Sequence, residues 1–172
     1  MTEFDHTSPS AEWESRIAAV WEAAVDGDEF ETITLIDALV AERPAGDAAG
    51  LFEAAGARDS AGLEAEAEPL YRAALAAGLD DDRRPQAVIQ LASTLRNLGR
   101  VEESIDMLRA EIATHPDGPL IDAAFAFLAL SLATRGDTLE ATSVALGVLS
   151  GHLPRYRRSV GAYATELLTG EH

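Results

Sequence analysis

The chain has 172 residues, 47% of them hydrophobic, so it is long enough to bury one core and too apolar to be wholly disordered. It contains no cysteine, which excludes disulfides, a thiolate nucleophile and cysteine-ligated metal sites. Its formal net charge of −17 repels phosphates and anionic lipid headgroups, so we expect neither nucleic acid nor a membrane as partner. The polar, acidic first residues do not resemble a signal peptide, and we expect a cytoplasmic protein.

The charge is unevenly distributed along the chain. Residues 1–82 contain 20 acidic residues and 4 arginines, whereas residues 83–172 contain 10 acidic residues and 9 arginines. All 13 basic residues are arginine. This asymmetry favours an acidic, solvated surface on the N-terminal half, with attraction of a basic protein partner as the alternative.

A glycine followed by the polar start of an apolar helix recurs four times. The instances begin at Gly27, Gly62, Gly99 and Gly136, which are 35, 37 and 37 residues apart. Such spacing is typical of helical repeats, in which each unit of about 34 residues is a helix hairpin. We therefore predict an all-α fold, an antiparallel helix-hairpin solenoid with a C-terminal capping helix.

The elements follow in chain order. Residues 1–11 are rich in polar residues and are predicted to be a flexible tail, before a single helical domain over residues 12–168. The predicted hairpins cover residues 13–46, 48–81, 85–118 and 122–153, and the capping helix covers about residues 155–168. The first hairpin fits the pattern least well and is either a degenerate repeat or an N-terminal cap.

The clearest unit covers residues 85–116. Apolar residues at three- and four-residue steps predict its first helix, which Gly99 ends because glycine adopts the left-handed conformation cheaply. A second stripe with the same period predicts the second helix, which ends before Pro116. The small residues Ala92 and Ser104 predict a close crossing of the two helices.

This unit resembles a tetratricopeptide repeat. The residues that stand at the motif positions are Leu91, Ala92, Leu95, Ser104, Leu108 and Pro116. The segments QLASTLRNLGR, EPLYRAALAAGL and YRRSVGAYATELL are similar to a bacterial subgroup, the tetratrico peptide repeat proteins of group five. The resemblance extends over nearly the whole chain and implies a protein–protein interaction module.

No motif in the sequence supports catalysis. The four histidines form no pair with metal-ligand spacing, and the serines lack a nucleophile elbow. The absence of lysine excludes a phosphate-binding loop of the usual type. The acidic run at residues 80–82 lacks the ligand spacing of a calcium loop and is interpreted as a helix cap. We therefore predict a protein that is not an enzyme and needs no cofactor or metal.

The resemblance also implies a concave groove lined by the first helices of the repeats. Carried over position by position, the partner-binding residues are Phe52, Ile89, Gln90, Ser93, Arg96, Asn97, Phe127 and Leu130. The apolar members are expected to supply affinity and the polar members specificity. Arg96 is suited to a carboxylate or phosphate of the partner, or else to an acidic neighbour in its own chain.

Residues 121–134 are apolar nearly all round, which leaves Phe127 and Leu130 outside the core stripe. A helix that is apolar on all sides is normally buried on all sides. A neighbouring helix, a second subunit or a bound peptide is therefore expected to cover them. The leading hypothesis is a module that binds a protein or peptide in its groove. The alternative is a self-associating structural protein with a homodimer interface there, and folding of residues 1–10 into the groove is a third hypothesis.

Overall fold

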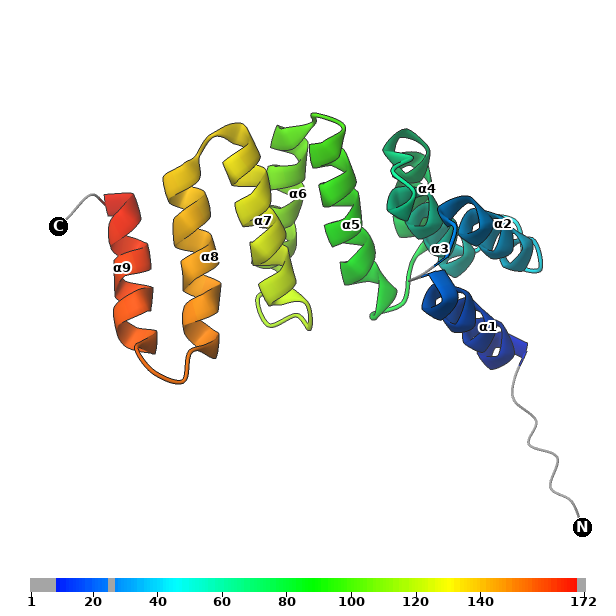
Figure 1. Cartoon of the computed structure of the whole chain (residues 1–172), viewed down its shortest axis with the longest axis horizontal. Coiled ribbons are helices and arrows are strands. Elements are labelled where there is room, and N and C mark those ends of the chain that lie inside the picture. Colours follow the sequence, from blue (N-terminus) through cyan, green and yellow to red (C-terminus); the bar gives the residue numbers. More distant parts are fainter. Residues whose placement is uncertain (1–8, 25–26, 170–172) are drawn as a thin grey trace, which may run out of the picture. The chain divides into compact units, whose positions relative to one another are not determined.

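The computed structural model describes residues 9–24 and 27–169, and their only regular secondary structure is α-helix (Figure 1). These residues form nine helices, namely four antiparallel pairs followed by α9, which confirms the predicted all-α repeat fold. None of these helices is long and apolar enough to cross a membrane. The helices group into two compact units, residues 1–79 and 80–172, and one continuous domain over residues 12–168 stays a prediction.

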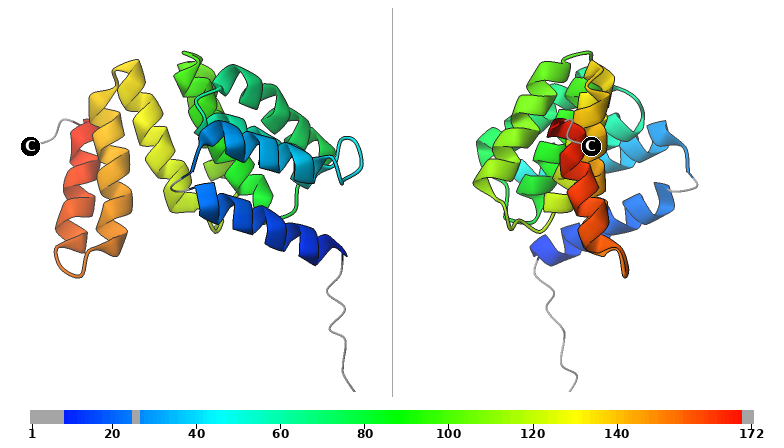
Figure 2. Two further views of the ribbon diagram at one scale, coloured as in Figure 1. Left: turned by 45° about the vertical axis from the view of Figure 1, so that its right-hand side comes forward. Right: turned by 90° about the vertical axis from the view of Figure 1, so that its left-hand side faces the viewer.

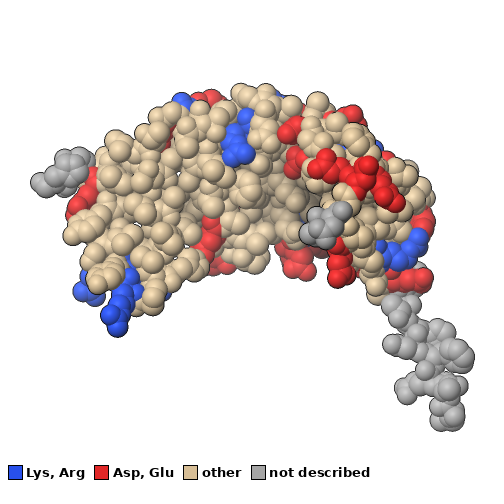
Figure 3. Space-filling model, in the orientation of Figure 1, with Lys and Arg blue, Asp and Glu red and all other residues tan. Residues whose placement is uncertain are grey.

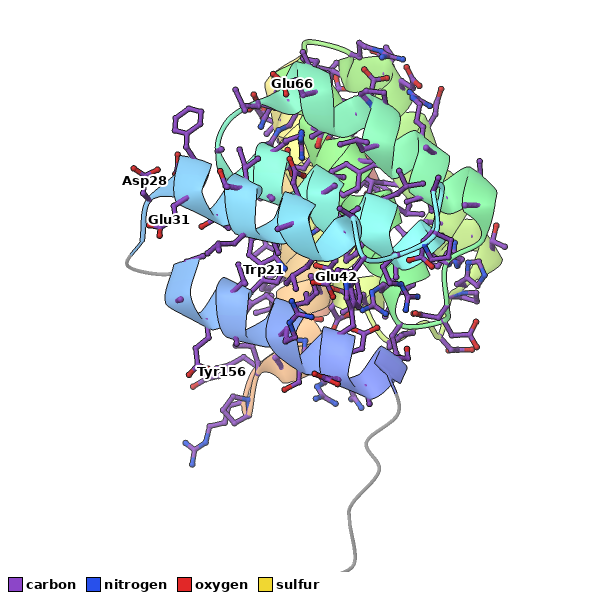
Figure 4. All side chains as sticks on the ribbon, turned by 90° about the vertical axis from the view of Figure 1, so that its right-hand side faces the viewer. Trp21, Asp28, Glu31, Glu42, Glu66 and Tyr156 are labelled. Atoms are coloured by element: carbon purple, nitrogen blue, oxygen red, sulfur yellow. The ribbon has the colours of Figure 1, made fainter. Side chains whose placement is uncertain are left out.

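The first unit contains four helices that pack on one another in sequence. They are α1 (Pro9–Ala24), α2 (Glu29–Val40), α3 (Ala48–Ser60) and α4 (Glu64–Ala77). The core joins Trp13 of α1 to Ile36 of α2 and Ala57 of α3. Because an indole N–H needs an acceptor when buried, Trp13 Nε1 donates to the backbone carbonyl of Leu39 at 2.9 Å. Trp21, which Figure 4 shows between α1 and its neighbours, donates to the Glu53 carboxylate of α3 at 2.8 Å.

The structure describes only the C-terminal end of the predicted tail. Residues 9–11 form the first turn of α1, which corrects the C-terminal end of the predicted flexible segment. Pro9 suits this place because the first N–H groups of a helix have no intrahelical acceptor. Residues 1–8 lie outside the described residues, and so does most of the segment in the hypothesis of a self-bound tail.

The second unit contains five helices. They are α5 (Arg83–Asn97), α6 (Val101–Thr114), α7 (Ile121–Arg135), α8 (Thr138–His152) and α9 (Arg157–Thr169). Helices α5, α6 and α7 all contact one another, and in Figure 1 α6 lies behind the other two. Helices α7, α8 and α9 instead follow one another in a row, which the views in Figure 2 also show.

Three of the four hairpins share one turn geometry. Gly62, Gly99 and Gly136 have φ values of +70°, +79° and +104°, which side chains with a Cβ rarely adopt. In each turn the N–H of the next residue donates to the carbonyl five residues earlier, with distances of 2.8, 2.8 and 3.0 Å for Leu63 to Arg58, Arg100 to Leu95 and Asp137 to Leu132. Donors and acceptors alike recur every 37 residues, so the repeat predicted from the glycines is a repeat of backbone hydrogen bonds.

The first hairpin is built differently. Gly27 is not among the glycines with positive φ. Helix α2 begins instead at Asp28, whose carboxylate accepts hydrogen bonds from the N–H groups of Phe30 and Glu31. An aspartate N-cap satisfies the free N–H groups of the first turn of α2.

The close contact at Ser104 joins α6 to α7, whereas the sequence predicted a close crossing of α5 and α6 at Ala92 and Ser104. Ala92 and Ser104 are completely buried. The hydroxyl groups of Ser104 and Ser131 lie 2.9 Å apart, and Ser131 donates to the carbonyl of Phe127 at 3.0 Å. A small hydroxyl side chain therefore joins α6 to α7 where a larger one would separate them.

Substitutions at Ser104 test this crossing. We expect Ser104→Ala to cost about 1 kcal/mol of unfolding free energy, since it removes one buried hydrogen bond. Ser104→Leu should cost roughly 1–3 kcal/mol more, because the added carbons overfill a closely packed site. Urea denaturation followed by circular dichroism measures both, and equal stabilities of the two variants would contradict the close crossing.

Candidate functional site

Two of the predicted partner-binding residues belong to the core. Phe52 is 8% exposed and its ring packs against Tyr71 of α4, with ring centroids 6.2 Å apart. Ile89 is 5% exposed and lies in the core that α5 shares with α6 and α7. The prediction that a partner buries these two side chains is corrected, because neighbouring helices already bury them.

The other predicted residues share one face of the second unit. Gln90 and Ser93 are half-buried and Asn97 is exposed, and their spacing of three and four residues places them on one stripe of α5. Phe127 and Leu130 follow Gln90 and Ser93 by 37 residues and occupy the same positions on α7. Since α5 and α7 pack side by side, the two stripes adjoin. We call this surface the first-helix face, and its members are Gln90, Ser93, Arg96, Asn97, Phe127 and Leu130.

The polar half of the first-helix face has unused hydrogen-bonding capacity. Arg96 donates to the Asn97 side-chain oxygen at 3.1 Å and forms no ion pair with any described carboxylate. The Gln90 Oε1 atom is enclosed and accepts no hydrogen bond within residues 9–24 and 27–169. The internal ion pair considered for Arg96 is therefore not seen, and its guanidinium is available to a ligand.

The apolar half opens into a groove that sequence reasoning missed. Helices α7 and α8 enclose a shallow groove of about 670 Å³. Alanines dominate its lining, with one leucine from α7, two leucines from α8 and a histidine in addition. We call it the alanine groove, and its main members are Ala126, Ala129, Ala133, Ala141, Ala145, Leu130, Leu146, Leu149 and His152. Leu130 and Leu149 are each 49% exposed. The sequence signal was the all-round apolar segment of residues 121–134, which leaves Leu130 outside the core stripe. The alanines themselves do not distinguish a buried face from an open one.

The arginines divide into paired and unpaired groups. Nine of the 13 form ion pairs with described carboxylates, namely Arg16, Arg43, Arg58, Arg72, Arg83, Arg84, Arg100, Arg109 and Arg135. Within this group, hydrogen bonds to Glu102 and Asp137 raise the pKa of Arg135.

The unpaired arginines lie at the candidate surfaces. Besides Arg96, they are Arg155, Arg157 and Arg158, all exposed beside the turn between α8 and α9. Figure 3 shows basic atoms gathered at this turn and a mostly uncharged surface over α7 and α8. His152, at the same end of α8, lies 2.9 Å from the Asp122 carboxylate. The Asp122 carboxylate thus lies beside His152 at this end of the alanine groove, and the three arginines follow His152 in the chain.

Several titratable groups of the described residues take part in contacts between helices. No three histidine or carboxylate side chains among them are close enough to hold a metal ion. His115 Nδ1 lies 3.3 Å from Glu111, which in turn pairs with Arg84, so this histidine belongs to an ion-pair network between α5 and α6. Burial raises the pKa of Tyr71 above its ordinary value, and its hydroxyl donates to Asp59 at 3.4 Å. These are contacts that stabilise helix packing.

Stability measurements can separate core residues from surface residues. Ile89→Ala is expected to lower the free energy of unfolding by about 2–5 kcal/mol, because it leaves a cavity in a packed core. Leu130→Ala should change it by less than about 1 kcal/mol, because half of that side chain is already solvated. Thermal and urea denaturation of the two variants provide the comparison, and a larger loss at Leu130 would reverse the assignment.

Comparison with known proteins gives one family match and two similar folds. Residues 48–167 match the family model described as Tetratrico peptide repeat. A search of curated proteins finds no significant match. Two crystal structures of TPR-like repeats from a candidate kinesin light chain of Podosopora anserina, one of them a point variant, align with TM-scores of 0.71. Their identities are 17% and 18%, over 96% of this chain and 90% and 91% of theirs, so the likeness establishes the fold alone.

Proposed function

The chain belongs to the tetratricopeptide repeat family, and from this premise we propose that it is an interaction module that binds a protein or peptide segment on the first-helix face of its second unit. Repeats of this kind present an extended surface built from successive helices, and their usual role is to bind other proteins. Within residues 9–24 and 27–169, no three histidine or carboxylate side chains lie close enough to hold a metal ion.

The observation that carries the proposal is the adjacency of a polar stripe and an apolar stripe. On α5, Gln90, Ser93 and Asn97 present amide and hydroxyl groups. On α7, Leu130 is 49% exposed beside the half-buried Phe127. A segment lying across both helices buries Leu130 and finds hydrogen-bonding groups on α5, which separates the source of affinity from the source of specificity.

Arg96 defines one feature of the segment. Its guanidinium has five N–H donors and, within the described residues, no carboxylate to pair with. A carboxylate of the partner can accept two parallel hydrogen bonds from it, an arrangement that lysine cannot reproduce. The proposed ligand is therefore a peptide segment with an apolar side chain for α7 and an acidic side chain for Arg96.

A peptide library provides the test. Random peptides of about 16 residues, displayed on phage, are selected on the wild-type protein and then titrated against variants. Leu130→Glu and Arg96→Ala should each weaken the selected peptides at least about tenfold, the loss expected when a central contact is removed. Leu35→Glu is the matched control, since this leucine on α2 is 45% exposed and lies in the other unit. Failure to select a peptide, or selected peptides that tolerate both substitutions, would refute the proposal.

Self-association is the second candidate. Two leucines at 49% exposure on the alanine groove, Leu130 and Leu149, form the kind of apolar surface that a second subunit can cover. Phe127 is unsuitable as a probe because it packs against the core of the second unit. Leu130→Asp is the appropriate variant.

Light scattering well above micromolar concentration distinguishes the two candidates. If a foreign segment is the ligand, we expect wild type and Leu130→Asp to have the same monomeric mass, because nothing in either protein depends on a second copy. A wild-type dimer that Leu130→Asp converts to monomer would instead establish the homodimer interface.

A further inference from the structure

The alanine groove is equivalent to the place that α7 occupies on the preceding hairpin. Helix α7 packs between α5 and α6, where Ile89, Ala92, Ile105 and Leu108 form a core with its Ala124, Leu128 and Leu132. The residues 37 positions after the four that receive α7 are Ala126, Ala129, Thr142 and Ala145. All four line the alanine groove. The internal repeat therefore makes the groove the position where the first helix of one more repeat would pack, and we call such a position a seat.

Helix α9 does not occupy that seat. It packs on α8 and makes no extended contact with α7, and Figure 1 shows α8 between the two. A Cβ atom at Gly161 of α9 would lie 3.4 Å from the hydroxyl of Ser150, and Leu167 and Leu168 line one depression with Leu139.

Helix α9 packs on the face of α8 that is turned away from α7. Leu139, Ser143 and Ser150 lie on it, and the residues 37 positions earlier, Glu102, Asp106 and Ala113, are exposed on α6. Ser143 is only 8% exposed. Leu139 stays 61% exposed, so the terminal helix covers only part of this face. The face of α8 that corresponds to the α7-binding face of α6 stays open.

The groove favours larger side chains than the seat of α7 does. Where the seat has Ile89, Ile105 and Leu108, the groove has Ala126, Thr142 and Ala145. Closely packed interiors are filled to similar density, so smaller groove residues require larger residues on the helix that fills them. A helix with leucine, phenylalanine or tryptophan at positions such as i, i+4 and i+7 meets this requirement.

Charge fixes the direction of that helix. Helix α7 begins beside the end of α6, where Leu120 and Ile121 share a small cavity with His115. A helix that enters the groove in the same direction begins beside His152 at the end of α8. Beyond His152 lie Arg155, Arg157 and Arg158, which have no ion pair with described residues, although Arg157 donates to the backbone carbonyl of Gly151. Acidic residues in the first turn of the incoming helix complement these arginines and its own dipole.

We propose that the alanine groove binds an amphipathic helix of a protein partner that carries acidic residues in its first turn and large apolar side chains along one face. This rests on the proposed function as an interaction module, but it uses a second surface that shares only Leu130 with the first-helix face.

The probe is a synthetic helical peptide of about 16 residues, with Asp-Glu-Glu in its first turn and leucine and phenylalanine along one face. A second peptide has the same composition, with the three acidic residues moved to its C-terminal end. Both carry fluorescein and are titrated with the full chain by fluorescence anisotropy. We expect saturable binding of the first peptide and binding at least about fivefold weaker for the second, because reversal places its acidic end away from the arginines.

Variants of the full chain locate the binding. Leu149→Glu should weaken the first peptide at least about tenfold, because it places a charge among apolar contacts. Joint replacement Arg155→Gln, Arg157→Gln and Arg158→Gln should weaken it severalfold and reduce its salt dependence. Leu35→Glu is again the matched control and should leave the affinity unchanged. A peptide that does not bind, or that tolerates Leu149→Glu, would overturn the proposal.

The two proposals can fail separately. Loss of peptide binding with Arg96→Ala but not with Leu149→Glu would place the helix on the first-helix face, so the groove proposal fails and the proposed function stands. The same conclusion follows if library peptides that depend on Arg96 are selected but the helical probe does not bind. The groove proposal then fails and the proposed function stands.

The chain contains no cysteine, so an engineered pair can detect other occupants. In the core of the second unit, Ala124 of α7 lies with Ile89 of α5. Ala126 follows Ile89 by 37 residues, and Val160 follows Ala124 by 36 residues. If α9 packed into the groove as α7 packs onto α5 and α6, Val160 would therefore lie near Ala126. In Ala126→Cys/Val160→Cys a disulfide requires the two Cα atoms to come within about 7 Å. We expect none under mild oxidation. A disulfide within a monomer would identify the chain's own α9 as the occupant, one between chains would identify a second copy, and either result overturns the proposal.

Discussion

A helix hairpin leaves part of its apolar surface uncovered, and the whole repeat depends on the next helix to cover it. In the second unit α7 does this for α5 and α6 by packing onto Ile89 and Leu108. The constraint passes along the chain, because α7 and α8 then present an equivalent surface of their own. Helix α9 leaves it open, so the requirement that builds the fold also produces the alanine groove.

The features that sequence predicted well depend on short stretches of chain. A glycine turn closes its hydrogen bond within six residues, so the spacing of Gly62, Gly99 and Gly136 is enough to locate three hairpins. Apolar residues at three- and four-residue steps likewise define the buried face of an isolated helix. Ser104 belongs with these features, since a small residue at a fixed place in the motif marks where helices cross.

The features that sequence did not predict depend on which helices become neighbours. Phe52 and Ile89 stand at positions expected to line a groove, but α3 and α5 are contacted from more than one side and these residues are buried. Helix α9 carries one apolar stripe, and its periodicity does not specify whether the inner or outer face of α8 receives it. The alanines that line the alanine groove gave no recognisable signal, because alanine is compatible with buried, exposed and closely crossing positions alike.

The net charge of the chain and the charged groups at one surface act over different distances, and they favour different partners. The total of −17 repels polyanions, but at physiological ionic strength its influence between exposed groups falls off over about 8 Å. Within that range the relevant fact is that Arg96, Arg155, Arg157 and Arg158 have no described carboxylate beside them, while nine other arginines do. An acidic protein can thus attract an acidic segment locally, because its unpaired cations are concentrated where its apolar surface is also exposed.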